Sequence, residues 1–234
     1  KDTNNLRTSI TNDLNLRSRD YFSNTGIKNN FNLYFKNLNS VGKNVDTYKS
    51  SPQIELNSLF EFSSELPLIK YSETFDQSLV PRLSLRINPS DMKNHSDDKR
   101  KINTNNIFNI NRIGINDSFE AGNSLTLGFD YRKDNKNETN DYLEVKLASV
   151  LRDKEESNIP SQTTLNKKNS NLFGSINYNF SNNLNVDYKF STDNKIEKFT
   201  YNSVGLGLTI NNFVTDFNFI KEDSTLGNTN LFDI

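Results

Sequence analysis

Apolar and polar residues alternate along residues 174–190, which read GSINYNFSNNLNVDYKF. Ile176, Tyr178 and Phe180 stand at every second position, with polar residues between them. The alternation resumes after the Ser-Asn-Asn segment 181–183, where Asn tolerates the left-handed backbone of a tight turn. Because successive side chains of a strand point to opposite faces, this stretch predicts a β-hairpin with one apolar and one polar face.

The same period of two recurs along the whole chain, and it predicts roughly a dozen strands at the spacing of an all-β fold. No segment shows the period of a helix, because Asn and Ser interrupt every candidate window. Besides the hairpin, the expected strands lie within residues 6–16, 31–35, 54–56, 83–87, 125–131, 143–147, 204–210 and 213–219.

Long connections alternate with short ones along this pattern. The segments 88–106 and 152–170 are long, charged loops, and within the second we expect residues 153–157 to be solvated. The connections at 181–183 and 210–212 read as tight turns. Long loops on one rim and short turns on the other are typical of outer-membrane β-barrels.

The apolar faces need either a protein core, as in a soluble β-sandwich, or lipid, as in a transmembrane barrel. Alternation alone does not decide between the two. Residues 170–180 offer the ~9–11 positions of a tilted membrane strand, whereas strands of soluble proteins average about 5–6. Aromatic residues suited to the interface girdles of a barrel are Tyr131, Tyr178, Phe180, Tyr188 and Phe190. These features favour an antiparallel transmembrane β-barrel.

The composition fits a barrel with a polar lumen. Only 33% of the residues are hydrophobic and the mean hydropathy is −0.75, which by themselves lean towards disorder. The 17 Phe and 9 Tyr argue against disorder, and much of the polarity comes from Asn and Ser that alternate with apolar residues. A water-filled lumen keeps such a polar face hydrated.

A barrel leaves no strand edge in lipid, so it must close. The sequence begins with KDTNNLRTSI, without Met or an apolar signal core, and ends with GNTNLFDI, and both ends lie within the strand pattern. We therefore expect residues 1–234 to form a single β-barrel domain that is a fragment of a larger outer-membrane barrel.

Charge and motifs exclude several classes of function. The formal net charge of −1 gives no basis for nucleic-acid binding. The chain has no Cys, which excludes disulfides, thiolate metal sites and Cys nucleophiles. It has no nucleophile elbow, phosphate loop or zinc-protease motif, and the glycines of 205–209 alternate within a strand. We therefore expect neither an enzyme nor a cofactor site.

The single His, His95, lies among Asp91, Asp97 and Asp98. Carboxylate oxygens are the ligands that Ca²⁺ and Mg²⁺ prefer, so a cation site is one hypothesis for this segment. However, the spacing matches no known binding loop, and neighbouring Lys and Arg compete for the carboxylates. We expect a solvated loop and no metal site.

Three stretches between residues 63 and 150 resemble the C-terminal barrel of the LptD family of lipopolysaccharide-assembly proteins. Residues 63–91 contain a Leu-Pro-Leu step, then Val-Pro-Arg, then an Asn-Pro turn, and residues 106–132 follow a variable loop. Ile107 stands where the family has Leu, and Ile115 where it has Asp. The matching positions are Leu79 to Arg82, then Ile107, Phe108, Asn111, Arg112, Gly114 and, shifted by one, Asp117, and then Ala121 to Gly128.

The resemblance implies non-enzymatic transport: the insertion of lipopolysaccharide into the outer leaflet of the bacterial outer membrane. In that family the lipoprotein LptE plugs the lumen, and a periplasmic jelly roll docks onto LptA. Acyl chains leave between the first and last strands while the sugar passes through the lumen. This sequence contains no jelly roll, so the bridge needs a segment outside it. The alternatives are a porin or plugged receptor barrel, and a soluble extracellular β-sandwich or adhesin.

The matching residues carry a structural and a functional interpretation. Pro81 and Pro89 predict the start of a strand and the turn after it, whereas Arg82 would face the lumen and contact the plug or the glycan. For the Asn-Arg-Ile-Gly segment 111–114, the structural interpretation is a loop fixed by hydrogen bonds, and the functional one is direct contact with substrate or plug. The complete set of motif and structural residues is Pro67, Pro81, Arg82, Pro89, Phe108, Asn111, Arg112, Gly114, Asn123 and Gly128.

Overall fold

The computed structural model describes residues 5–45, 48–180, 183–224 and 227–233. These residues form one antiparallel sheet, which confirms the predicted all-β class. None of its described segments is a helix long and apolar enough to cross a membrane. The strands are β1 (Leu6–Arg17), β2 (Tyr21–Phe22), β3 (Lys28–Lys43), β4 (Gln53–Glu65), β5 (Leu68–Tyr71), β6 (Phe75–Asn88), β7 (Gly122–Asn135), β8 (Tyr142–Arg152), β9 (Leu172–Phe180), β10 (Leu184–Thr192), β11 (Phe199–Ile210), β12 (Phe213–Ser224) and β13 (Gly227–Asp233), with a 3₁₀ helix at Ser161–Thr163.

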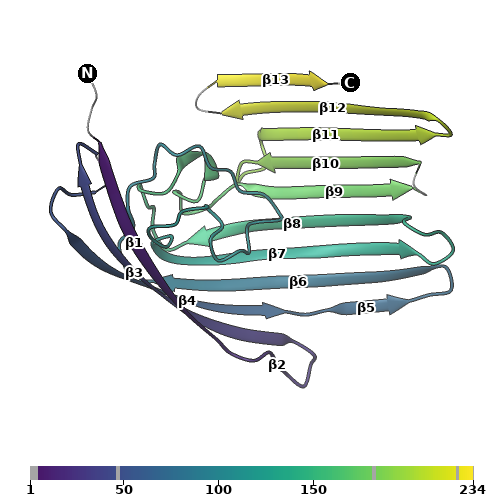
Figure 1. The fold of residues 1–234 in the computed structure, drawn as a ribbon. Helices are drawn as coiled ribbons and strands as arrows, with labels where there is room; N and C mark the ends of the chain where they lie inside the picture. Colours follow the sequence, from purple (N-terminus) through teal and green to yellow (C-terminus); the bar gives the residue numbers. More distant parts are fainter. Residues whose placement is uncertain (1–4, 46–47, 181–182, 225–226, 234) are drawn as a thin grey trace.

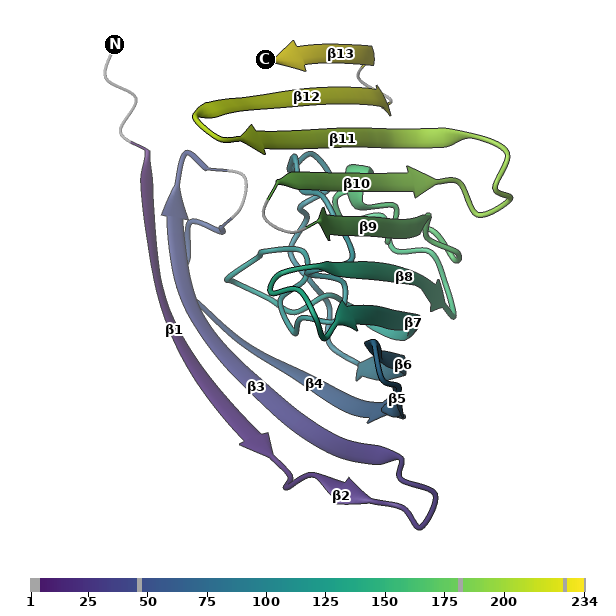
Figure 2. The ribbon, with the colours of Figure 1, turned by 90° about the vertical axis from the view of Figure 1, so that its right-hand side faces the viewer.

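The sheet is a meander in which strands that follow one another in the chain pair with each other. It runs β1, β3, β4, β6 and then in chain order to β13, while the short strands β2 and β5 pair with β3 and β6. Figures 1 and 2 show a strongly curved sheet with β1 and β13 as its two edges. The sheet is antiparallel, as predicted, and no pairing joins these two edges within the described residues, so it is not closed.

The long strands turn most of their apolar residues to the convex face and their polar residues to the concave face. In the hairpin of β9 and β10, Ile176 lies opposite Tyr188 on the convex face, and Asn177 lies opposite Asp187 on the concave face. Many convex-face side chains are exposed, and Ile54 and Leu56 of β4 are each 77% exposed. The apolar face of the hairpin therefore covers no protein core within the described part of the chain.

The long connections lie on one rim of the sheet, and they fold back over its concave face (Figures 1 and 2). They are residues 89–121, between β6 and β7, and residues 153–171, between β8 and β9. Short connections such as 136–141 and 211–212 join strands at the opposite rim. The predicted turn at 181–183 includes residues 181 and 182, which lie outside the described residues.

The prediction of a solvated loop is wrong at His95, whose side chain is largely buried, and it is confirmed at 153–157, which is mostly exposed. Apolar residues of both long connections enclose a core with the concave face of β8 and β9. Their apolar residues are scattered at no strand period, which is why the pattern did not reveal them. The core consists of Met92, Ile102, Ile107, Ile113, Ile115, Ala121, Ala148, Val150, Ile159, Leu165 and Phe173.

The prediction that Pro81 starts a strand is also wrong, because Pro81 lies inside β6. Before this point β6 pairs with β5, and from Arg82 onward it pairs with β4. Pro81 has no N–H to donate, and it occupies the break between the two partners. Its carbonyl accepts a hydrogen bond from the N–H of Leu66 at 3.1 Å, next to Pro67. Pro89 directly follows the end of β6.

Candidate functional site

The two long connections form a folded body on the concave face, which we call the inner loop unit (residues 89–121 and 153–171). It rests mainly on β6, β7, β8 and β9, and several matching residues lie in it or directly beneath it. Three of its charged groups, those of Arg112, Asp117 and Glu120, are buried, whereas most of the others lie at the surface. The inner loop unit is therefore the natural candidate for a functional site.

A row of charged and polar residues crosses the floor beneath this unit. Glu61 of β4 lies opposite Arg86 of β6, and Arg86 lies opposite Ser124 of β7. Ser124 in turn lies opposite Arg152 of β8. Arg86 and Arg152 are 2% and 7% exposed, and buried guanidinium groups need anions and acceptors around them.

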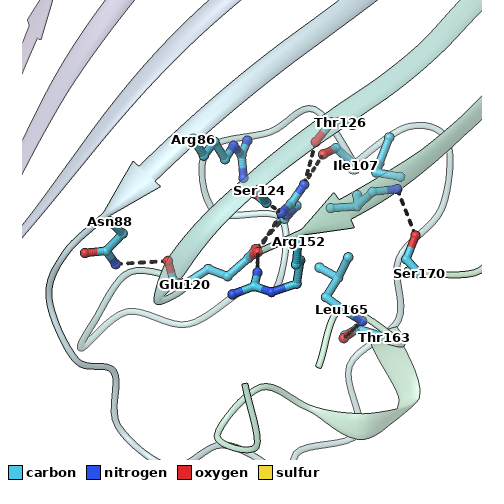
Figure 3. Close-up of polar contacts among 12 residues, drawn as sticks. Arg86, Asn88, Ile107, Glu120, Ser124, Thr126, Arg152, Thr163, Leu165 and Ser170 are labelled. Atoms are coloured by element: carbon cyan, nitrogen blue, oxygen red, sulfur yellow. Dashed lines mark hydrogen bonds and ion pairs between the residues drawn. The ribbon is translucent and has the colours of Figure 1, made fainter. Parts of the chain in front are cut away.

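Arg112 connects the inner loop unit to this floor through a two-pronged ion pair. Its Nε donates to Oε2 of Glu120 at 2.6 Å, and its Nη2 donates to Oε1 at 2.5 Å. The remaining N–H groups reach the hydroxyls of Thr126 at 2.8 Å and Ser124 at 3.0 Å, and the carbonyl of Ile107 at 3.4 Å. Figure 3 shows Glu120 with the β7 hydroxyls of Ser124 and Thr126 around this contact. Such bidentate pairs combine charge with fixed geometry.

Glu120 lies between two guanidinium groups, because Arg152 also donates to its Oε1 (Figure 3). Its main-chain carbonyl accepts a hydrogen bond from Nδ2 of Asn88 at 2.9 Å. Burial alone would raise the pKa of Glu120. The charge and hydrogen bonds of Arg112, and then the charges of Arg152 and Arg86, outweigh burial and lower this pKa to about 2. The carboxylate therefore stays ionised at neutral pH.

Arg86 makes a second connection between the floor and the inner loop unit. Its Nε donates to Oε2 of Glu61 at 2.9 Å. Its Nη2 donates to the carbonyls of Phe108 at 3.2 Å and Asn109 at 2.6 Å. One arginine of the sheet thus holds both a neighbouring strand and the backbone of the loop.

Arg82, Phe108 and Gly128 meet although they are far apart in the sequence. Arg82 lies on the concave face, 3.2 Å from Oδ2 of Asp130, and its guanidinium carbon lies 4.2 Å from the centre of the Phe108 ring. A Cβ at position 128 would lie 3.1 Å from this ring and 2.6 Å from the carbonyl oxygen of Leu147. Glycine therefore allows the ring to approach the sheet.

Asn111, Gly114 and Asn123 shape the loop rather than pointing together at one site. Oδ1 of Asn111 accepts a hydrogen bond from the N–H of Ile115 at 2.9 Å, and Gly114 has a left-handed φ of 68°. Nδ2 of Asn123 donates to Oδ2 of Asp153 at 2.9 Å, which connects the start of β7 to the second half of the inner loop unit. These contacts match the structural interpretation of the motif.

His95 connects the inner loop unit to the first strand, and its side chain is only 13% exposed, so the expected solvated environment is wrong here. Its Nδ1 lies 3.0 Å from Asp98, and its Nε2 lies 2.9 Å from Asp117. Arg7 of β1 lies 3.8 Å from the same Asp117 carboxylate. Nearby, Lys93 pairs with a glutamate of β4. The described residues contain no group of three or more His, Cys, Asp or Glu suited to hold a metal ion.

Sequence reasoning missed Glu61, Arg86, Glu120 and Arg152. Glu61, Arg86 and Arg152 lie at polar-face positions, and this parity was readable from the alternation. The strands that carry the two arginines, β6 and β8, end at the long connections. Glu120 follows no period, and only its contact with Arg112 reveals its importance. Polar-face arginines next to a long connection are thus the signal that could have located the site.

Comparisons with known proteins agree with the resemblance seen in the motifs. The family model described as "LptD: LPS transport system D" matches residues 58–230, which includes the inner loop unit and the strands beneath it. No curated protein matches the chain.

Replacing Glu120 by Gln should loosen the inner loop unit, because two buried arginines lose their shared anion. Removing one partner of a buried ion pair costs about 3–5 kcal/mol. Hydrogen exchange of the amides in 89–121 should accelerate accordingly, while the sheet stays protected. Glu144→Gln is the matched control, since Glu144 pairs on a partly exposed part of the concave face and should cost about 0–1 kcal/mol. Equal exchange in the two variants would contradict the assigned role of Glu120.

The His95–Asp117 contact should make the inner loop unit sensitive to pH. The hydrogen bond to Asp117 raises the pKa of His95, and its stabilisation is therefore complete below the ordinary histidine pKa and lost as pH rises through the raised one. Burial opposes ionisation of Asp117, but His95 outweighs it and lowers the pKa of Asp117, so this stabilisation is lost only as pH falls through that lowered value.

Amide hydrogen exchange of residues 93–98, corrected for intrinsic rates, should accelerate as pH rises above the ordinary histidine pKa of about 6.5 and through the raised pKa of His95. In His95→Gln this additional pH dependence should vanish. If the variant keeps the wild-type pH profile, another group is responsible.

Proposed function

The chain belongs to the LptD family, and from this membership we propose that it acts in the outer membrane as part of the translocon that inserts lipopolysaccharide into the outer leaflet. The family serves transport and assembly, and it is not a family of enzymes. The observation that carries the proposal is the match over residues 58–230, supported by the two-faced sheet.

The distribution of charge on the sheet supports a membrane barrel. On β8, β9 and β10 the charged residues all face the concave side, and the convex side carries apolar or small neutral residues. A soluble β-sandwich or adhesin would cover the convex face with a second layer, and no described residue does so. Lipid accepts such a face, and we infer that further strands at β1 and β13 close the sheet into a single barrel domain larger than this chain.

The concave face supports passage of a hydrated glycan. It carries neutral Asn and Ser together with charged Asp and Lys, and these groups suit sugar hydroxyls. The mixture of both charges gives no strong ion selectivity. The inner loop unit occupies part of this face, which fits a gated or plugged translocon better than an open diffusion porin.

We assign the matching residues to positioning of the inner loop unit. The contacts of Arg82, Phe108, Arg112 and Gly128 are within the chain, and they leave no obvious group aimed at a substrate. We further infer an LptE-like lipoprotein against the concave face, and an LptA-like bridge that docks on a jelly roll outside this sequence.

Depletion of the protein in its bacterium tests the proposed function. Lipopolysaccharide reaching the cell surface should fall several-fold while its synthesis continues, so it should accumulate inside the cell. Restored expression of the wild-type protein should reverse the defect. Surface levels of an unrelated outer-membrane protein, assayed in parallel, exclude a general failure of the envelope. Unchanged surface lipopolysaccharide after depletion would contradict the proposal.

Adjacent arginine substitutions in β9 test the membrane orientation. Ile176→Arg puts a charge on the convex face, which should cost about 2–4 kcal/mol if this position is near the bilayer midplane. Asn177→Arg puts the same charge on the concave face beside Asp187 and should cost little. Denaturant titration of both variants folded into lipid vesicles measures the difference. Equal stability of the two variants would argue against lipid at the convex face.

A further inference from the structure

A cavity of about 760 Å³ lies between the inner loop unit and strands β12 and β13. Its wall includes the three consecutive cations of 99–101, the turn around Asn111 and Gly114, Gln162 of the second connection, and Thr229 of β13. This volume lies within the range of about 300–1,000 Å³ that is usual for small-ligand sites. The cavity is not needed for the contacts that hold the inner loop unit to the sheet.

The cavity carries positive charge that the protein does not neutralise. Nζ of Lys101 pairs with Glu222 of β12 at 2.6 Å. Lys99 and Arg100 are exposed, and neither side chain has an ion pair or hydrogen bond with any residue in the described ranges. Two adjacent cations therefore face the same space without an ion pair, because the carboxylate in the lining, Glu222, is paired with Lys101.

The backbone that carries these cations is held in place from several sides. The N–H of Arg100 donates to the carbonyl of Asp98 at 3.0 Å, and the side chain of Asp98 contacts His95. On the other side Ile102 is 6% exposed and belongs to the apolar core. The segment is thus fixed before any ligand arrives, which lowers the entropy cost of binding.

Neutral donors line the rest of the cavity. Oδ1 of Asn111 accepts a hydrogen bond from the N–H of Ile115, and the side-chain NH₂ group of Asn111 stays free to donate. The side chains of Gln162 and Thr229 make no hydrogen bond to any other described residue. Amide and hydroxyl groups of this kind suit sugar hydroxyls, whereas acyl chains would gain nothing from them.

We propose that this cavity binds a phosphate-bearing saccharide. Arg100 can bind two phosphate oxygens with its planar fork, and Lys99 adds a point charge. Asn111, Gln162 and Thr229 face the sugar hydroxyls. The inference rests on the proposed function and deepens it, because the cavity becomes a holding point for the phosphorylated part of the glycan on the concave side of the sheet.

Isothermal titration of the protein in detergent micelles tests the site. The probe is deacylated lipopolysaccharide, which keeps the phosphorylated sugars, and the comparison probes are the same material after phosphatase treatment and inorganic phosphate. Loss of charged hydrogen bonds in Lys99→Gln/Arg100→Gln should weaken binding of the first probe by about tenfold or more. Lys167→Gln/Lys168→Gln removes the same charge elsewhere in the inner loop unit and should leave the affinity unchanged.

Wild-type preference for the phosphorylated saccharide over both other probes, lost in the first double variant only, supports the proposal. Equal binding of the phosphatase-treated probe, or equal loss in both double variants, would overturn it. Inorganic phosphate binding as tightly as the saccharide would reduce the cavity to a free-anion site and would overturn the assigned ligand. Circular dichroism of both variants verifies that they fold.

The outcome is separable from that of the depletion experiment. A depletion defect together with unaltered saccharide binding in the double variant would leave the transport function standing and remove this site. Specific binding at the site without a depletion defect would leave this saccharide site standing and remove the proposed transport function.

Discussion

The inner loop unit depends on one buried carboxylate. Glu120 lies between Arg112 of the loop and Arg152 of the sheet, and each of these three charged groups would be costly to bury alone. Because the arginine of β8 is fixed by strand register, the carboxylate and then the loop take up defined positions on the sheet. The apolar core beside this cluster adds burial, but it has no comparable directional constraint.

This constraint links the two faces of the sheet to the proposed transport. With the inner loop unit fixed on the concave side, polar groups and cavities gather there, and the convex side is left largely apolar. Contacts from the unit to Arg7 of β1 and Glu222 of β12 extend its hold towards both edges of the curved sheet. A body that contacts β1 at one edge and β12, the neighbour of the other edge strand, is well placed to influence how the barrel closes around it.

The sheet was predictable from the sequence, and the interior was not. The alternation with a period of two predicted that these segments are strands and on which face of the sheet residues such as Ile176 and Asn177 lie. Both are local properties, because successive side chains of a strand point to opposite faces. The start of β6 was missed, since Pro81 is tolerated at a break between partners that only the pairing reveals. The burial of Ile107 and His95 arises from contacts between residues far apart in the chain, and no local period encodes it.

The central claim is that the convex face meets lipid and the concave face meets water. The chain has no Cys, so single cysteine substitutions in β9 can each carry one spin label without interference. In lipid bilayers, labels at positions 176 and 178 should be accessible to oxygen, and labels at 177 and 179 to a water-soluble nickel complex. Shielding of 176 and 178 from both reagents would mean that the convex face is a protein core, and it would contradict the membrane account.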